Sequence, residues 1–399
     1  MFPELYQKVI EIHLSESQRL TLQLLIMLLQ SYRNVRLSRL AELFPQPIKY
    51  ESRVRNLQRF LNLPQLSVKL LWFPILKKWI RTEYQQRTAN RKQRRRAKKL
   101  KLIHQGYLLL VLDRTQWKER NIMMLSLVWG KHAIPIYWQI LSQKGSSNLS
   151  QQKKIIAPVL RFLRHYPIVV LGDREFHSVK LAKWLEKQGV DFALRQKKNT
   201  CVSDDEQVYL ALKDLEIKPG QSHFYQNLSC TKEHRLGNFN LGVYWKRKYR
   251  GKTEQKDPWY ILTSLPNLEL TLSFYRARWS IETMFKDCKT GGYNLENTRV
   301  NERRLLATIL LIAIAYTLAT LQGISCQNLK VSEYICRPTE KNRSIPRHSD
   351  FWIGLYGSLW VKSMKLWSDL ATHLMNLKSH KRLYFQKGMH ALTLIKSAL

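Results

Sequence analysis

Long apolar runs alternate with polar, basic segments along the chain, and their lengths predict its elements. The run Gly106–Asp113 is continuously apolar up to its last residue, which is typical of a strand covered on both faces. Two more strand-like runs follow closely and indicate an antiparallel meander. The expected order continues with a helix over 147–165, a strand over 167–172, a helix over 178–188 and a strand over 191–194. The pattern predicts a mixed α/β fold.

The first 85 residues are expected to form a helical domain. A long apolar helix is predicted over Gln18–Tyr32, with Ser15 or Ser17 as its cap. A short helix and the break at residues 45–47 precede a basic amphipathic helix over Tyr50–Leu61. This basic helix carries Arg53, Arg55 and Arg59. A short helix, a turn and a basic helix are compatible with a helix-turn-helix DNA reader, and equally with an ordinary helical bundle.

The net charge is the strongest indication in the sequence of what the protein binds. Lys and Arg number 67 against 29 Asp and Glu, for a formal charge of +38. Such a charge favours a polyanionic partner, above all DNA. Residues 86–103 form a predicted basic linker around Arg94, Arg95 and Arg96, without any acidic residue. This tract either lies along a phosphate backbone or is a solvated connection.

Cysteine usage and the apolar runs indicate the compartment. The five cysteines are scattered and form no CxxC pair, which fits a reducing cytosol and no zinc site. The N-terminus does not resemble a signal peptide. The apolar run 305–321 is at the short limit for a membrane span, so a buried core helix is preferred. We therefore expect a cytoplasmic, nucleoid-associated protein.

Residues 267–290 carry the most ordered set of polar side chains. Read as a helix from about Leu270, they place Tyr275, Arg278, Glu282 and Lys289 within a sector of roughly 60°. The opposite side is apolar, with residues such as Ala277, Ile281, Met284 and Cys288. Taken alone, this pattern also fits an ordinary surface helix.

The spacing Tyr-x2-Arg-x3-Glu-x6-Lys resembles the signature of DDE transposases of the insertion-sequence-four type. Gly172-Asp-Arg-Glu-Phe176 also resembles that family, and so does the position of Asp113 and Asp173 after apolar strands. A lone Asp at a strand end is more often a turn or cap residue. Together with Glu282, the order of elements resembles an RNase H-like core of the retroviral-integrase type.

The resemblance implies a site and a set of roles. Asp113, Asp173 and Glu282 would be the catalytic carboxylates and would bind Mg²⁺, or Mn²⁺, since both ions prefer oxygen ligands. Tyr275, Arg278 and Lys289 would hold DNA phosphates. In relatives a Trp at the place of Trp259 stacks on a flipped base; the alternatives here are a core Trp259 or stacking by Trp245.

The long gap between Asp173 and Glu282 indicates an inserted domain. The expected domains are a core in two parts, 104–195 and 267–325, a mostly β insertion over 196–266, and a helical C-terminal region over 326–399 that packs on the core or on a second subunit.

The implied activity is cut-and-paste transposition. The protein would bind the terminal inverted repeats of an insertion sequence in double-stranded DNA as a homodimer. It would cleave the transposon ends by metal-dependent hydrolysis and join their 3′-OH groups to target DNA. A nuclease that does not join DNA and a non-catalytic DNA-binding protein on the same fold are the alternatives.

Overall fold

The computed structural model describes residues 3–88, 103–117, 119–143, 145–204, 208–231, 236–247, 257–289, 291–337 and 347–398. The chain divides into two compact units, each described by itself. One comprises residues 76–285, and the other combines residues 1–75 with residues 286–399.

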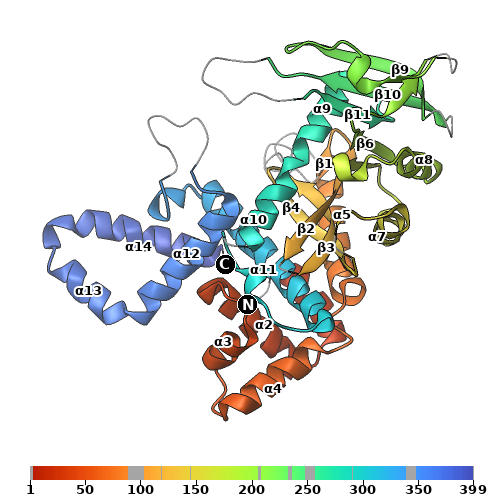
Figure 1. Cartoon of the computed structure of the whole chain (residues 1–399). Helices are drawn as coiled ribbons and strands as arrows, with labels where there is room; N and C mark the ends of the chain where they lie inside the picture. Colours follow the sequence, from red (N-terminus) through yellow and green to blue (C-terminus); the bar gives the residue numbers. More distant parts are fainter. Residues whose placement is uncertain are drawn as a thin grey trace. The chain divides into compact units, whose positions relative to one another are not determined.

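A single large sheet organises the unit of residues 76–285 (Figure 1). Its strand order is β4-β3-β2-β5-β6-β11-β10-β9-β7-β8, and β1 pairs with β2 beside this path. The pairs β2–β5 and β5–β6 are parallel, while the other pairs are antiparallel. The strands are β1 Ile103–His104, β2 Tyr107–Trp117, β3 Arg120–Trp129, β4 His132–Leu141, β5 Ile168–Gly172, β6 Asp191–Arg195, β7 Cys201–Ser203, β8 Leu210–Ala211, β9 Ser222–Cys230, β10 Leu236–Tyr244 and β11 Trp259–Thr263.

Burial explains why the central strands read as continuous apolar runs. Every residue of β5 is buried, and so are Leu108–Leu112 of β2 and Asn121–Trp129 of β3. A strand with helices on both faces has no solvent side, so the alternation of polar and apolar residues disappears. The mixed α/β class expected from the sequence is confirmed.

Helices cover both faces of the central strands. On one face, Met284 of α10 (Trp279–Cys288) contacts Ser126 of β3, and Phe274 of α9 (Leu268–Ala277) packs against Tyr107. Trp129 is three positions beyond Ser126 and therefore points to the other face. There it meets Trp79 of α5 (Phe73–Thr88) edge to face. The remaining helices of this unit are α7 Leu149–Phe162, α8 Val179–Lys187 and the short η2 Arg174–Phe176 and η3 Leu212–Asp214.

The strands of the expected insertion continue the same sheet. β11 pairs with β6 through Ile261↔Arg195, Leu262↔Leu194 and Thr263↔Ala193. The Thr263 hydroxyl also donates a hydrogen bond to the carbonyl oxygen of Phe192 at 2.6 Å. Main-chain pairing therefore connects the strand that precedes α9 directly to the parallel strands.

The other unit is helical, as expected for both ends of the chain. Its elements are α1 Glu4–His13, α2 Glu16–Tyr32, α3 Leu37–Leu43, α4 Tyr50–Leu61, the π-helical η1 Val68–Trp72, η4 Leu295–Asn297, α11 Glu302–Asn328, η5 Ser332–Tyr334, α12 Asp350–Leu366, α13 Ser368–Asn376, η6 Ser379–Lys381 and α14 Arg382–Ser397. Ser15 caps α2 in a reciprocal capping box with Gln18, which decides between the two candidate caps.

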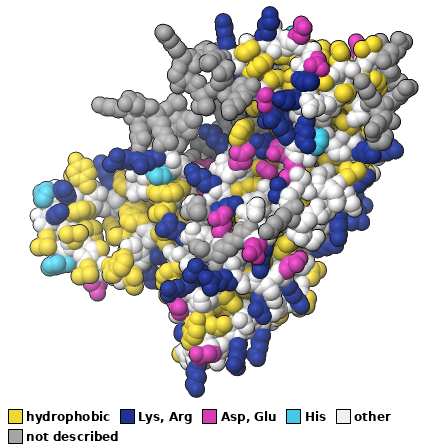
Figure 2. Space-filling view, viewed as in Figure 1, with side chains coloured by type: hydrophobic (Ala, Val, Ile, Leu, Met, Phe, Trp, Pro, Cys, Tyr) yellow, Lys and Arg dark blue, Asp and Glu magenta, His cyan; other side chains and the backbone are white. Residues whose placement is uncertain are grey.

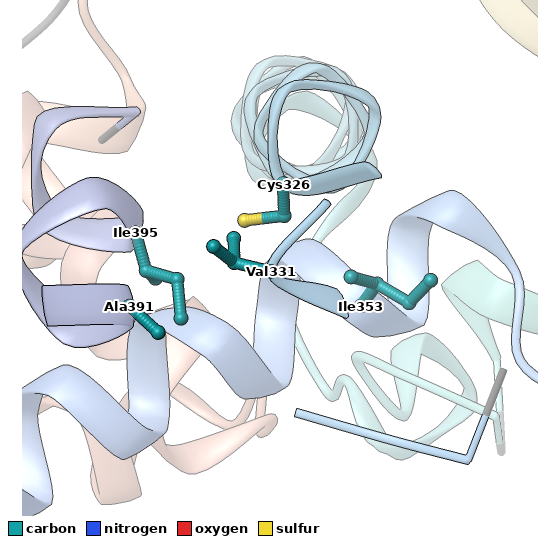
Figure 3. Packing of buried hydrophobic residues seen from close by; sticks show 5 residues of the cluster. All are labelled: Cys326, Val331, Ile353, Ala391 and Ile395. Atoms are coloured by element: carbon teal, nitrogen blue, oxygen red, sulfur yellow. The ribbon is translucent and has the colours of Figure 1, made fainter. Parts of the chain in front are cut away.

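Helix α11 is the core of this unit. It is long and apolar enough to cross a membrane by length and composition, but 83% of its most apolar window is buried inside the structure. It packs against α12, α2 and α4. Near its end, Cys326 joins Val331, Ile353 of α12, and Ala391 and Ile395 of α14 in an apolar cluster (Figure 3).

Two glycines allow α11 and α12 to approach closely. A Cβ at Gly354 would overlap the carbonyl oxygen of Ala319, and a Cβ at Gly323 would overlap that of Asp350. Because both obstacles are backbone atoms, neither helix can yield without moving as a whole.

We expect Gly354→Ala to lower the free energy of unfolding by about 2–3 kcal/mol through overpacking. Gly388→Ala is the matched control, because no atom lies within 4 Å of its added methyl group in α14. That change should stabilise the protein by about 0.5–1 kcal/mol through the helix preference of Ala. Thermal unfolding of both variants measures the difference. Equal changes in the free energy of unfolding for the two variants would show that α11 and α12 do not make this close contact.

Candidate active site

The parallel pair β2–β5 brings Asp113 and Asp173 to one place. Leu112 is the register partner of Gly172, so the two aspartates occupy the next position along each chain. The prediction that the first strand ends at Asp113 is wrong, since β2 continues to Trp117 in its pairing with β3. Only its pairing with β5 ends there. The pairing of the two strands ends at this point, so both aspartates lie at the carboxyl end of the pair.

Local hydrogen bonds orient both carboxylates. One oxygen of Asp113 accepts the backbone N–H of Arg114 at 2.7 Å. Asp173 caps η2 and accepts the backbone N–H of Glu175 at 2.9 Å. Gly172, the last residue of β5, has no room for a side chain, because a Cβ there would approach Phe176 and Leu194 to 2.9 and 3.0 Å. This close packing explains why a glycine precedes the second aspartate.

Glu282 reaches Asp113 through Arg278. The Arg278 guanidinium lies 2.8 Å from one Glu282 oxygen and 3.5 Å from one Asp113 oxygen. The Arg278 side chain is only 8% exposed, the Asp113 side chain 16% and the Glu282 side chain 45%. The buried Arg278 guanidinium thus pairs with both carboxylates, while the Glu282 carboxylate remains partly accessible to solvent.

The helix that carries these residues differs from the one predicted. Instead of one helix from Leu270, α9 and α10 meet at Arg278, where backbone bonds from Arg278 to Tyr275 and from Ile281 to Arg278 tighten the turn. Tyr275 is 1% exposed and does not lie on an open polar face. The apolar side is confirmed for Ile281 and Met284, which are fully buried.

The pKa of Asp113 responds to both other carboxylates. Burial and the charges of Asp173 and Glu282 raise the pKa of Asp113, whereas the Arg114 N–H and Arg278 lower it, and the result is about 7. These effects require Asp173 and Glu282 to lie near Asp113. Such a group attracts cations, because a positive charge favours ionised carboxyls.

A family described as "Transposase DDE domain" matches residues 104–318, more than half of the chain. The chain belongs to the transposase DDE domain family. No curated protein matches it significantly. Seven chains of solved structures do. One is a piggyBac transposase synaptic complex with hairpin DNA, with a TM-score of 0.43 and 14% identity, covering 90% of this chain and 77% of that one.

The family makes this chain a DNA transposase, of a class that cuts and joins DNA with divalent metal ions. The donors of the candidate site fit such an ion in kind, because all three residues offer carboxylate oxygens. Among the described residues, however, no three His, Cys, Asp or Glu side chains converge into a metal-binding group. Arg278 stands between two of the three candidate ligands of the transposase, so metal binding there requires this guanidinium to shift.

Glu175 and Arg195 are two residues of the transposase site that the sequence reasoning did not single out. Glu175 accepts hydrogen bonds from Arg114 Nε at 2.8 Å, and from the backbone N–H and the hydroxyl of Ser147 at 3.0 and 2.9 Å. It therefore ties the turn after β5 to β2. Burial lowers the pKa of Arg195, whose guanidinium faces Tyr275. In the sequence, a charged residue directly after the predicted strand 191–194 could have indicated Arg195.

Aromatic rings line the approach to Arg278 in the transposase. Trp259 is partly buried and meets the rings of Tyr275 and Tyr244 at 5.1 and 5.8 Å, both nearly edge to face. Arg278 lies 5.0 Å from the ring of Trp279, which is 51% exposed. Trp279 was also missed, because its position next to the signature Arg carries no pattern of its own.

The other predicted DNA-binding residues of the transposase belong to the helical unit or lie outside the described residues. Lys289 follows α10 and pairs with Glu296 at 3.1 Å. On α4, Arg55 and Arg59 are exposed, whereas Arg53 is partly buried and contacts the carbonyl oxygen of Phe44 at 3.5 Å. The tract with Arg94, Arg95 and Arg96 lies outside the described residues.

The raised pKa of Asp113 predicts a pH-dependent stability in metal-free protein. Its stabilising effect is complete below the unfolded pKa near 4 and is lost as the pH rises through about 7. Wild type should therefore lose stability relative to Asp113→Asn by about 1.4 kcal/mol per pH unit between pH 5 and 7, with little further change above. Urea denaturation in EDTA at constant ionic strength measures this. If the unfolding free energies of wild type and Asp113→Asn changed in parallel with pH, this prediction would be contradicted.

Proposed function

We propose that this DNA transposase is of the insertion-sequence-four type and performs cut-and-paste transposition. It would bind the terminal inverted repeats of its element, cleave the ends and join the 3′-OH groups to target DNA. The observation that carries the proposal is that Asp113 and Asp173 follow the last register pair of β2 and β5, while Arg278 pairs with both Asp113 and Glu282. The spacing of Tyr275, Arg278, Glu282 and Lys289 adds to it.

An RNase H-like core is part of this proposal. The order β4-β3-β2-β5-β6, with an antiparallel meander followed by two parallel neighbours, supports it. In such a core the first and fourth strands are adjacent. On this proposal they correspond to β2, which contains Asp113, and β5, which Asp173 follows.

Each carboxylate has a place in the proposed chemistry. Asp113, Asp173 and Glu282 would hold Mg²⁺, or Mn²⁺, which supplies Lewis acidity at the scissile phosphate and lowers the pKa of an attacking water or 3′-OH. Glu282 is the most exposed of Asp113, Glu282 and Arg278, so it can adjust to the ion. Arg278 would exchange its two carboxylates for a DNA phosphate, a partner that suits a forked guanidinium equally well.

The remaining residues would hold the DNA. Lys289 would contact a phosphate near the cleaved end. Tyr275 would do so only after a rearrangement, because it is buried beside Trp259 and Arg278. Exposed Arg55 and Arg59, together with Arg53, would contact the terminal repeat, and Arg94, Arg95 and Arg96 would add sequence-independent affinity. We propose that the protein acts on double-stranded DNA in the cytoplasm, as a homodimer that holds both transposon ends.

Substitution of the carboxylates tests the chemistry. Asp113→Asn, Asp173→Asn and Glu282→Gln should each reduce end cleavage in Mg²⁺ at least roughly a thousandfold, because the three act as a unit. DNA affinity should stay within about threefold, since the +38 charge hardly changes. Gel assays of strand cleavage and DNA binding give both quantities.

Glu186→Gln is the control, because this carboxylate pairs with Lys183 on the outside of α8. It should cleave like wild type. Near-normal cleavage by any of the three test variants would remove that residue from the site. Cuts without joining of 3′-OH ends would identify a nuclease instead, and binding without any cuts a DNA-binding protein.

Trp259→Ala tests base stacking. Stacking of an extruded base on the indole would offset roughly 1–3 kcal/mol of the cost of bending the strand. The variant should therefore spare the first nick, slow the later step about tenfold or more, and recover partly on DNA with an abasic site at the flipped position. Time courses of both steps on the two DNAs measure this.

Trp245→Ala is the matched control, and it also tests the rival residue. If Trp259 is instead a core residue that only supports Tyr275, its variant would lose melting temperature and both steps together, with no abasic rescue. Selective slowing with Trp245→Ala would transfer the stacking role to that residue.

A further inference from the structure

An apolar pocket opens in the antiparallel part of the sheet, and we call it the β8 pocket. It has a volume of about 370 Å³, and its apolar lining consists of Val202, Val208, Leu210, Leu215, Leu228 and Leu241. Val202, Leu228 and Leu241 are at most 5% exposed. Val208 and Leu210, by contrast, are 62% and 49% exposed. The pocket thus combines a buried floor with an open apolar rim, and it can take up an apolar side chain from outside.

The segment that borders the β8 pocket is acidic, in contrast to the rest of the chain. Between residues 203 and 217, five Asp or Glu residues stand against one Lys, whereas the whole chain has 67 Lys and Arg against 29 Asp and Glu. Figure 2 shows Lys and Arg side chains spread over the visible face of the molecule. Asp204 lines the pocket, Asp214 and Glu216 flank its lining residue Leu215, and all three acidic residues are exposed. Such a rim repels nucleic acid and attracts cationic groups.

The pocket lies at the end of the sheet. Among the described strands, β8 is the last in the sheet order, and it pairs with β7 through Cys201↔Ala211 and Val202↔Leu210. Both residues of the second pair line the pocket. An extended segment can therefore lie along the outer edge of β8 and insert one side chain into the pocket, as in other complexes that form by strand addition.

We propose that the β8 pocket binds an extended, basic segment of another protein. One apolar side chain of that segment enters the pocket, while Lys or Arg residues on either side of it face Asp204, Asp214 and Glu216. Charge complementarity favours this partner over DNA, an anionic membrane or an uncharged ligand. The proposal goes beyond the transposition chemistry, because none of these residues belongs to the candidate active site. A partner on this acidic surface leaves the basic surfaces of the transposase free for DNA.

Titration of the full chain with synthetic peptides, in the absence of DNA, tests the proposal, and fluorescence anisotropy gives the dissociation constants. The probe is the labelled peptide Lys-Arg-Lys-Leu-Lys-Arg-Lys. Replacement of its leucine by serine should weaken binding about tenfold or more, because the apolar side chain is no longer buried. Replacement of its basic residues by glycine should weaken binding by a similar factor. Added salt should also weaken binding of the probe, because exposed ion pairs are screened.

Variants of the transposase locate the binding. Asp214→Lys combined with Glu216→Lys should weaken binding of the probe about tenfold or more. Glu333→Lys combined with Asp369→Lys is the matched control, because it changes the net charge equally at two exposed positions of the helical unit, and it should leave the affinity within about twofold. Leu210→Ser should weaken the leucine peptide about fivefold and leave the serine peptide unchanged, because only leucine contacts the pocket wall. All five positions are exposed, so melting temperature and end cleavage should stay close to wild type.

Wild-type protein that does not bind the probe would overturn the proposal, as would equal losses of affinity in the test pair and the control pair. Equal binding of the leucine and serine peptides would reduce the effect to a general attraction between charges and reject the pocket. Equal binding of the glycine-flanked peptide would reject the basic partner in favour of an uncharged ligand. Self-association of wild type that Asp214→Lys with Glu216→Lys abolishes would reject it in favour of a second copy as the occupant.

Discussion

The pairing of β2 with β5 is the contact on which the site depends. Five parallel register pairs, from Leu108↔Ile168 to Leu112↔Gly172, connect segments that are some sixty residues apart in the sequence. Asp113 and Asp173 follow the last pair, so the distance between them is set by the main chain and not by flexible side chains. Every residue of the pairing segments is buried. Hydrophobic burial thus stabilises the arrangement that brings two like charges together.

The accumulation of negative charge is balanced by a buried cation. Arg278 supplies its guanidinium to Asp113 and Glu282 and counteracts the rise in the pKa of Asp113. Arg195, at the end of β6, adds a second cation on the side of Tyr275. A metal ion could replace this internal cation beside the carboxylates, because it would restore the charge balance, and the freed Arg278 guanidinium could then pair with a DNA phosphate.

The junction of α9 and α10 links this site to the antiparallel part of the sheet. β11 pairs with β6 in the sheet, and Trp259 at its start packs against Tyr275 of α9. A movement of β11 would therefore shift Trp259 against Tyr275, which lies beside Arg278. Glu175 has the corresponding role on the other side, where it holds the turn after β5 against Arg114 and Ser147. The candidate catalytic residues are thus supported by neighbours from several separate segments.

Local signals in the sequence determined the elements, the charge and the candidate chemistry. The apolar runs identified β2 and β5, Ser15 or Ser17 indicated the start of α2, and the spacing from Tyr275 to Lys289 indicated the family. These features depend on contacts within one or two turns or along one strand, so they can be read without knowing the fold.

Long-range packing was decided only by the tertiary structure. An ideal helix puts Tyr275 and Glu282 on the same face, but the tightened turn at Arg278 and the ring of Trp259 bury the tyrosine. The continuation of β2 beyond Asp113 depends on its pairing with β3. The pairing of β6 with β11 joins residues separated by the inserted strands, and no local pattern specifies it. Such contacts arise from the competition of the whole chain for burial and hydrogen bonds, which no short segment contains.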